Sequence, residues 1–285
     1  MDNLGYALTD LGDRTTGAQS AQLLALATGA YRAALEVYTK SDLPQDWAKT
    51  QSNLGITLLR QSERTSGTQA VDLLAQAAQA YRATLEVYTR ANLPQEWADS
   101  QNNLATVLRD QGNRSSGAEA LDLFAQAVQA YRAALDVYTK ADESYKWAST
   151  QNNLGFSPSD EAHRSSEPQA TALIAQAVAA FQAALEIRTK TDQPLYWANT
   201  QKGLGRAYDL QGDHAAAIAA LESALELLPT DPDLLETISH IDHEQLFRFD
   251  RALELDQRRL AVDSSIGAKL DSEEANLCRP LRQMY

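Results

Sequence analysis

The sequence lacks the residues that would support a disulfide framework, a membrane span or a basic binding surface. Its 285 residues include one cysteine, Cys278, so no internal disulfide can form and a zinc cluster is excluded. No run reaches the roughly 18 apolar residues that a membrane-spanning helix needs. Lys and Arg number 25 against 38 Asp and Glu, which gives a formal net charge of −13. Because phosphate backbones and anionic lipids attract clustered Lys and Arg, we expect neither nucleic acid nor a membrane as a partner.

Catalytic and targeting motifs are missing as well. The sequence has no Gly-rich phosphate loop, no nucleophile elbow and no His-Glu-x-x-His element. Among its histidines only His240 and His243 lie close together, and without further ligands this favours a solvated or capping role over a weak metal site. No basic segment leading into an apolar one follows Met1. We therefore expect a cytoplasmic protein that is not an enzyme and has no cofactor and no metal.

What the sequence does contain is a repeat with a period of 50 residues. A fixed period in this range is typical of a solenoid, in which each unit buries its apolar face only by stacking on the next unit. The period therefore predicts one elongated array with function on a shared surface. The recurring positions are Trp47, Trp97, Trp147 and Trp197; Leu4, Leu54, Leu104, Leu154 and Leu204; and Tyr31, Tyr81, Tyr131 and Phe181.

Each copy has the pattern of two helices. In the second copy, apolar residues at helical spacing predict a helix from Gly67 to Thr89. Its start has the form of a capping box, and a basic residue at its end would oppose the helix dipole. The other helix is predicted to begin at a proline, where no N–H is needed. The cap pairs are Thr16 and Gln19, Ser66 and Gln69, Ser116 and Glu119, and Ser166 and Gln169; the basic residues are Lys40, Arg90, Lys140 and Lys190; the prolines are Pro44, Pro94 and Pro194.

The recurrent tryptophans have two interpretations. Trp47, Leu54 and Leu58 share one face of the predicted helix. An aromatic residue within such a stripe favours packing against neighbouring helices over an aromatic ligand cage. We therefore expect the tryptophans to pack between helices.

The fifth copy has the spacing Leu-Gly-x2-Tyr, then Ala followed four residues later by a large apolar residue, then Pro. The residues are Leu204, Gly205, Tyr208, Gly212, Ala217, Leu221, Ala224 and Pro229. This copy resembles a tetratricopeptide repeat. The earlier copies resemble the same repeat lengthened at 61–70 and 91–96, in the style of bacterial arrays and of kinesin light chains. The resemblance implies an all-α tetratricopeptide-type solenoid of antiparallel helix pairs that form a right-handed superhelix.

The copies predict how the chain is organised. We expect a solenoid over residues 1–263, with long repeats at about 1–46, 47–96, 97–146 and 147–196, a standard-length repeat at 197–231 and a C-terminal helix pair at 232–263. That last pair is predicted at Pro232 to His243 and Glu244 to Val262, and residues 264–285 are expected to form a loosely held tail. The first helix should lack its front half and expose apolar stacking surface. Pro158 should end or kink its helix, at a cost of roughly 3 kcal/mol.

The family resemblance implies a concave groove, lined by the first helix of each pair, that receives an extended peptide or a partner helix. Asparagines recur at these positions, and an Asn side chain can both donate to and accept from a peptide backbone. Alternatively, they satisfy polar groups within the stack. The predicted binding residues are Asn3, Lys49, Asn53, Ile56, Arg60, Asn102, Asn103, Thr106, Asn152, Asn153, Phe156, Lys202 and Arg206, of which the basic ones would select charge. Further groove positions hold Asp2, Tyr6, Ser52, Asp99, Asp110, Ser149 and Asn199.

Two more specific binding modes, a carboxylate clamp and a row of anion-binding arginines, can be compared with the sequence. Tetratricopeptide domains that hold C-terminal carboxylates need a Lys-Asn pair, and Asp2, Tyr6, Ser52 and Ile56 stand at those positions, so a carboxylate clamp is not expected. An arginine also recurs in the turn between the paired helices. These arginines would either bind anions or, as we favour, donate to the exposed carbonyls that end the preceding helix. They are Arg14, Arg64, Arg114 and Arg164.

These patterns lead to three hypotheses of function. The first is a non-enzymatic scaffold that binds a protein or peptide in the groove. The second is a homo-oligomer that assembles through the ends of the solenoid, since unfinished ends expose stacking surface. The third is a regulatory or sensor domain of a larger enzyme or signalling protein. An enzyme in its own right is the reading that the sequence supports least.

Overall fold

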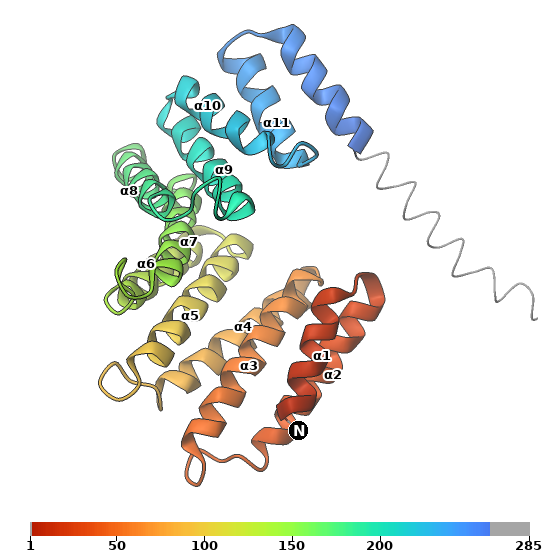
Figure 1. The fold of residues 1–285 in the computed structure, drawn as a ribbon, viewed down its shortest axis with the longest axis vertical. Coiled ribbons are helices and arrows are strands. Elements are labelled where there is room, and N and C mark those ends of the chain that lie inside the picture. The colour runs from red at the N-terminus through yellow and green to blue at the C-terminus, as the bar shows by residue number, and fades with distance from the viewer. Residues whose placement is uncertain (1, 263–285) are drawn as a thin grey trace, which may run out of the picture. The chain divides into compact units, whose positions relative to one another are not determined.

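A computed structural model describes residues 2–262 of the chain, except for the side chain of Glu167, and Figure 1 shows its helices. Within this part of the chain there is no strand. A further helical segment covers 249–262. The named helices are α1 Asp2–Arg14, α2 Gly17–Leu35, α3 Pro44–Glu63, α4 Gly67–Leu85, α5 Pro94–Arg114, α6 Gly117–Leu135, α7 Ser144–Ala162, α8 Glu167–Leu185, α9 Pro194–Gln211, α10 His214–Leu225 and α11 Pro232–His240, followed by the π-helical turn Ile241–Gln245.

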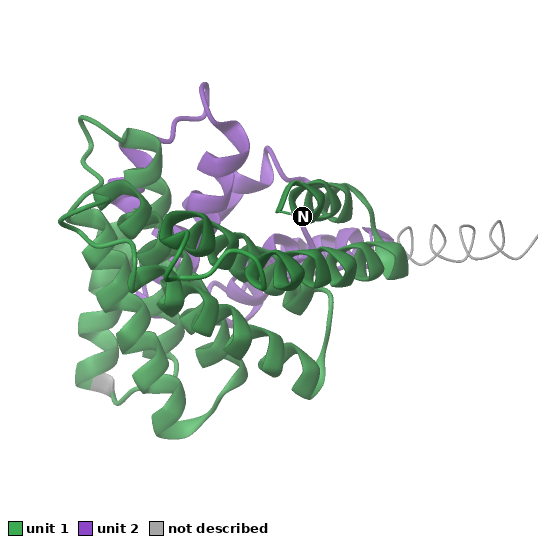
Figure 2. Cartoon of the chain, turned by 90° about the horizontal axis from the view of Figure 1, so that it is seen from below, with its two compact units in different colours: residues 1–180 green, residues 181–285 purple. Residues whose placement is uncertain are grey.

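The chain divides into two compact units, residues 1–180 and 181–285, which Figure 2 colours separately. In the first unit, α1 packs with α2, α3 with α4, and α5 with α6, and each second helix also packs against the first helix of the next pair. The first helices themselves meet, α1 with α3, α3 with α5 and α5 with α7. In the second unit α9 packs with α10, and α10 with α11. The described part of the chain is thus an all-α solenoid of helix pairs.

The prolines start their helices as predicted. Pro44, Pro94 and Pro194 occupy the first turns of α3, α5 and α9. The predicted capping boxes are wrong in their hydrogen bonds. Thr16, Ser66 and Ser116 are the N-cap residues of α2, α4 and α6, but none of their side chains caps a backbone N–H. The glycine that follows each of them has a positive φ, +63° at Gly67 for example, and this turn of the backbone carries the hydroxyl away from the first N–H groups.

The second helices are shorter than predicted, because α4 ends at Leu85 and not at Thr89. The basic residues at 40, 90, 140 and 190 therefore lie beyond the helix ends and do not oppose the helix dipoles. Each lies over the ring of the tryptophan that follows it, with Arg90 6.0 Å from the centre of Trp97. Lys40 also pairs with Glu86, and Arg90 pairs with Asp136 at 3.1 Å. These basic residues link each pair of helices to the next.

Aromatic residues form the core of the first unit. Tyr31, Tyr81 and Tyr131 are all buried in one apolar cluster. Gly55 lies directly over Tyr81, and a Cβ at that position would come within 2.8 Å of the ring. The tryptophans pack on the core as predicted: Trp97 and Trp147 lie half-buried against the cluster around Ala98 and Tyr138.

Two predicted helix boundaries differ from the structure. Of the two outcomes predicted for Pro158, an end or a kink, the helix end is wrong, since α7 continues to Ala162 with Ser157 and Pro158 both buried. Burial of this side of α7 outweighs the local cost of the proline, as tertiary packing often does. The last predicted helix begins at 249 and not at Glu244, because α11 passes into the π-helical turn and Phe247 then adopts a φ of +54°. The predicted tail at 264–285 lies outside the described residues, as does Cys278.

Candidate peptide-binding groove

The predicted groove residues of the first unit all lie on its first helices, α1, α3, α5 and α7. These helices contact one another in order, α1 with α3, α3 with α5 and α5 with α7. Asn3 is exposed on α1, and Lys49 is exposed near the start of α3. Lys202, Arg206 and Asn199 belong to α9 in the second unit and form a separate group.

A cavity of about 190 Å³ lies between α1 and α3. The structure brings three predicted groove residues together there: Tyr6 from α1, and Asn53 and Ile56 from α3. The cavity therefore combines apolar surface with an amide and with hydroxyl and carboxylate groups. Its full lining is Tyr6, Thr9, Asp10, Asp13, Tyr31, Asn53 and Ile56.

Two hydroxyl groups of this cavity, those of Tyr31 and Thr9, are held in place by burial and hydrogen bonding. Burial raises the pKa of Tyr31 to about 12, and the nearby Thr9 hydroxyl offsets only part of that effect. Thr9 donates to the carbonyl of Gly5 at 2.9 Å and shares a hydrogen bond of 2.9 Å with Thr57 on α3. Tyr31 is thus a neutral phenol at any physiological pH.

Charged residues form the rim of the same cavity. Arg60 of α3, predicted to select charge, lies 3.7 Å from the carboxylate of Asp13 and 3.3 Å from that of Glu63. Asp10 pairs with Arg14 at 3.0 Å. All of these side chains are well exposed, so the pairs are weak and can exchange with charges of a ligand. The rim offers both signs of charge, with carboxylates lining the cavity itself.

Arg109, which the sequence patterns did not predict as a site residue, lies between α5 and α7. Arg109 lies 5.5 Å over the ring of Phe156, pairs with Asp110 at 3.1 Å and is 3.9 Å from Asp160. Burial lowers the pKa of Arg109, but Tyr131, Asp110 and Asp160 outweigh burial and the net shift is upward. Burial likewise raises the pKa of Asp160, against the charge of Arg109. The sequence does mark Arg109 as unusual, because it breaks the 50-residue repeat: the matching residues of other copies are Thr9, Leu59 and Ser159.

The asparagines divide into two kinds. Thr150 of α7 donates to Asn102 at 3.2 Å, and Asn102 in turn donates to Asn103 at 3.4 Å. Asn152, which is buried, donates to Asn153 at 3.4 Å. The first asparagine of each adjacent pair thus takes part in contacts inside the stack. Asn53, Asn103 and Asn153 are half-buried on α3, α5 and α7.

In the second unit the predicted cations are paired. Lys202 donates to Asp231 at 2.9 Å and to Asp233 at 3.1 Å, and Arg206 is 3.7 Å from Asp233. The hydrogen bond from Lys202 lowers the pKa of Asp233. Asp231 also accepts from the N–H of Leu234, so it caps α11. Lys202 therefore ties the start of α11 to α9.

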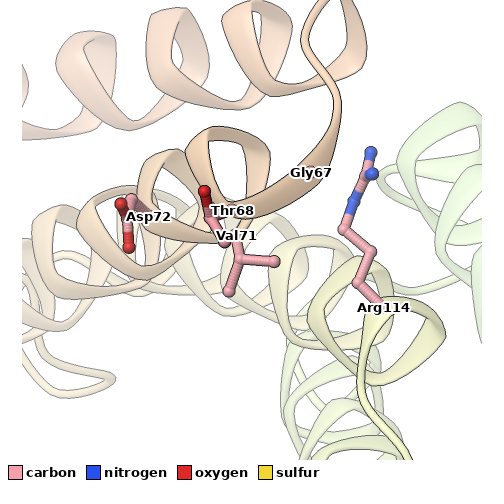
Figure 3. A pocket seen from close by; sticks show the side chains of 5 residues that line it. All are labelled: Gly67, Thr68, Val71, Asp72 and Arg114. Atoms are coloured by element: carbon pink, nitrogen blue, oxygen red, sulfur yellow. The ribbon is translucent and has the colours of Figure 1, made fainter.

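Two of the four recurring arginines, Arg64 and Arg164, act as predicted, whereas Arg114 reaches α3 and Arg14 pairs with Asp10. Arg64 and Arg164 each donate to a carbonyl four residues earlier at 2.8 Å, and Arg114 donates to the carbonyl of Ser62 at 3.5 Å. Arg114 also lines a second cavity, of about 580 Å³, with Gly67, Thr68, Val71 and Asp72. Figure 3 shows the three side chains of α4 on one side of this cavity and Arg114, at the end of α5, on the other.

The described residues 2–262 contain neither a metal-binding cluster nor a membrane-spanning helix. Within them no group of three or more His, Cys, Asp or Glu is arranged to hold a metal ion. His243 instead lies 2.6 Å from Glu244 and edge-on to Phe249. None of the helices in the described part of the chain combines the length and the hydrophobicity needed to cross a membrane.

The fold was compared with solved structures. The chain is similar to MamA, with a TM-score of 0.50 and 18% identity over 69% of this chain and 92% of that one. It is similar to the C-terminal part of a TPR repeat-containing protein from Cytophaga hutchinsonii, with a TM-score of 0.54 and 13% identity over 96% and 83% of the two chains. A third similar structure is the assembly chaperone of RpL4, Acl4, with a TM-score of 0.52 and 14% identity over 96% and 99%. At these identities the likeness concerns the fold.

The sequence was compared with family models and with curated proteins. No curated protein matches it. Models of the tetratricopeptide repeat match at two places, residues 97–137 and residues 169–230. The second match includes the compact copy in which the repeat spacing is most regular. These matches show that the chain contains tetratricopeptide repeats, in agreement with the all-α solenoid of helix pairs.

Proposed function

We propose that the chain is a non-enzymatic protein-interaction scaffold that binds an extended peptide on the face formed by its first helices, with the strongest contact between α1 and α3. The observation that carries the proposal is the cavity in which Tyr6, Asn53 and Ile56 meet. It lies on the surface where successive first helices contact one another, and it is lined by side chains from both.

The lining suggests how a peptide would be held. The amide of Asn53 can donate to and accept from the peptide backbone, which fixes the chain without reading its sequence. Tyr6, which is 68% exposed, and Ile56 supply apolar surface for one peptide side chain. Tyr6 is already rigid and amphipathic, so it loses little entropy when it is covered.

Charge at the cavity defines the class of peptide. Asp10 and Asp13 are part of the lining; Asp10 pairs with Arg14, and Asp13 pairs with Arg60 and with Arg64. A basic peptide residue can pair with either carboxylate, while an acidic residue would meet the same carboxylates across a short distance. The expected ligand is therefore an extended segment with an apolar residue next to a Lys or Arg. The peptide would continue along Asn103 and Asn153 on α5 and α7.

Selection from a phage-displayed library of random peptides, with the full chain as bait, tests this proposal. Asn53→Ala should weaken a selected peptide by about fivefold to tenfold, and Ile56→Arg should abolish its binding. The matched control is Val71→Arg, which places the same cation at the cavity between α4 and Arg114. Peptides that lose affinity with Val71→Arg but keep it with Ile56→Arg would refute the proposed site.

A further inference from the structure

One buried hydroxyl group in the core of the first unit makes no hydrogen bond. The side chain of Tyr81 is fully buried, and its hydroxyl oxygen has no hydrogen-bond partner among the described residues. Burial raises the pKa of Tyr81, against the positive charge of Arg60, so the group is a neutral donor. A buried hydroxyl without an acceptor is costly to the folded state, and such groups are few in native proteins. Its presence therefore calls for an explanation.

The repeat explains why this hydroxyl lacks a partner. In the third copy, Thr106 shares a hydrogen bond of 2.9 Å with the hydroxyl of Tyr131. In the first copy, the hydroxyl of Thr9 lies beside the matching tyrosine and lowers its pKa. The residues of the second copy at these two positions are Ile56 and Leu59, which have no polar side-chain atom. The second copy thus keeps the tyrosine and lacks both of the residues that could pair with it.

The hydroxyl of Tyr81 lies toward the face formed by the first helices. The ring carbon that bears it would be 2.8 Å from a Cβ on Gly55, so this end of the ring reaches α3. The ring of Tyr31 lies against Gly5 in the same way, and Tyr31 lines the cavity between α1 and α3. Because the copies are built alike, the Tyr81 hydroxyl occupies the corresponding place between α3 and α5.

The surroundings of this hydroxyl favour an uncharged acceptor. Ile56 and Leu59 are partly buried and pack against the apolar cluster that contains the tyrosines. A carboxylate in such surroundings would lose most of its hydration. Arg60 could offset that loss only by leaving Asp13 and Glu63, with which it is already paired. A carbonyl oxygen carries no charge, and an extended peptide has one on every residue.

We propose that Tyr81 donates a hydrogen bond to a main-chain carbonyl of the bound peptide between α3 and α5, an inference that rests on the proposed peptide site. Leu59 turns aside when the peptide binds, since partly exposed side chains change rotamer readily. The space then resembles the cavity that Tyr6 and Thr9 line between α1 and α3. Neighbouring first helices are about 10 Å apart, so this carbonyl lies about three residues along the peptide from its apolar residue.

The variant Tyr81→Phe of the full chain tests the inference with a peptide that phage display selects. It removes one oxygen atom, so its affinity for the peptide should fall about fivefold while its thermal midpoint stays the same or rises. The matched control is Tyr131→Phe, which should lose thermal stability and keep its affinity, because Thr106 already pairs with that hydroxyl. Isothermal titration calorimetry measures the affinities, and differential scanning calorimetry measures the midpoints.

A second measurement identifies the acceptor on the peptide. Each carbonyl oxygen of the peptide is replaced in turn by sulfur, which is a poorer acceptor. One of these replacements should weaken binding to the parent chain and leave binding to Tyr81→Phe unchanged, because the two changes remove the same hydrogen bond. If no replacement behaves in this way, the acceptor is not a main-chain carbonyl and the inference is overturned.

The results also separate this inference from the proposed function. Affinity that Ile56→Arg abolishes and Tyr81→Phe leaves unchanged would overturn the inference alone. A selection that yields no peptide dependent on Ile56 would refute the proposed site and the inference with it. A loss of thermal stability in Tyr81→Phe as large as that in Tyr131→Phe would overturn the inference too, because the hydroxyl would then be paired in the free chain.

Discussion

The space between α1 and α3 and the equivalent space between α5 and α7 are filled differently. Between α1 and α3, the side chains of Tyr6, Thr9, Asn53 and Ile56 surround a cavity of about 190 Å³. The matching positions between α5 and α7 are Thr106, Arg109, Asn153 and Phe156. There the guanidinium of Arg109 lies over the ring of Phe156 and pairs with two carboxylates.

The difference shows that repeats with similar backbones can enclose different spaces between their first helices. Thr9 leaves a cavity between α1 and α3. Arg109, at the matching position, fills the space between α5 and α7 and adds a network of ion pairs. The space between successive first helices is therefore set by a few side chains per copy, and the copies of one array can differ in it.

The largest effect is expected when Arg109 is replaced by threonine, the residue at the matching position 9. Arg109→Thr leaves Asp160 partly buried without its nearest cation, and this should lower the free energy of unfolding by about 2 kcal/mol. Urea denaturation measures the loss. Adding Asp160→Asn should restore about half of it, because the unpaired charge is then gone. If the single variant is as stable as the parent, the charge network does not stabilise this step.

A smaller effect is expected from exchanging the small residues above the tyrosines. A Cβ on Gly5 would come within 2.7 Å of the Tyr31 ring, while the third copy already has Ala105 at this position. Gly5→Ala should cost about 1–2 kcal/mol, because the ring must move toward the cavity that it lines. Ala105→Gly should cost about 1 kcal/mol through helix propensity alone. Thermal unfolding compares them, and a larger loss for Ala105→Gly would contradict this account.

The smallest effect on stability is expected from removing the hydroxyl groups of two buried tyrosines. The Tyr131 hydroxyl shares a hydrogen bond of 2.9 Å with Thr106, whereas the buried Tyr81 hydroxyl has no hydrogen-bond partner. Tyr131→Phe should therefore cost about 1 kcal/mol, and Tyr81→Phe should be neutral or slightly stabilising. Differential scanning calorimetry on the two variants measures both. Equal losses would show that Tyr81 has a partner in solution.

Much of the fold could be predicted from the sequence because it depends on periodic features. The apolar stripes, the helix-starting prolines and the Leu-Gly-x2-Tyr spacing each specify local geometry, and the helix pairs follow from them. The boundaries that failed depend on longer-range effects. The second helix was predicted too long because Lys40 and its equivalents bind the next copy and not their own helix end. Burial of α7 overrides Pro158.

The candidate site was predictable only in part. Asn53 and Ile56 could be placed on a groove from their register, but a cavity at one step and a filled space at another depend on side-chain volume across two helices. Arg109 shows this limit, since a single residue that breaks the repeat changes the whole step. Periodicity places positions on a face, and non-periodic residues decide whether a cavity or a filled space lies there.

Photo-crosslinking tests the central claim, peptide binding between α1 and α3, most directly. A photoreactive phenylalanine analogue would replace Ile56 in one version of the full chain and Val71 in another, and each would be irradiated with a peptide selected on the unmodified chain. The account predicts a crosslink from position 56 and none from position 71. A crosslink from position 71 alone would place the peptide at the cavity of α4 and Arg114 and contradict the account.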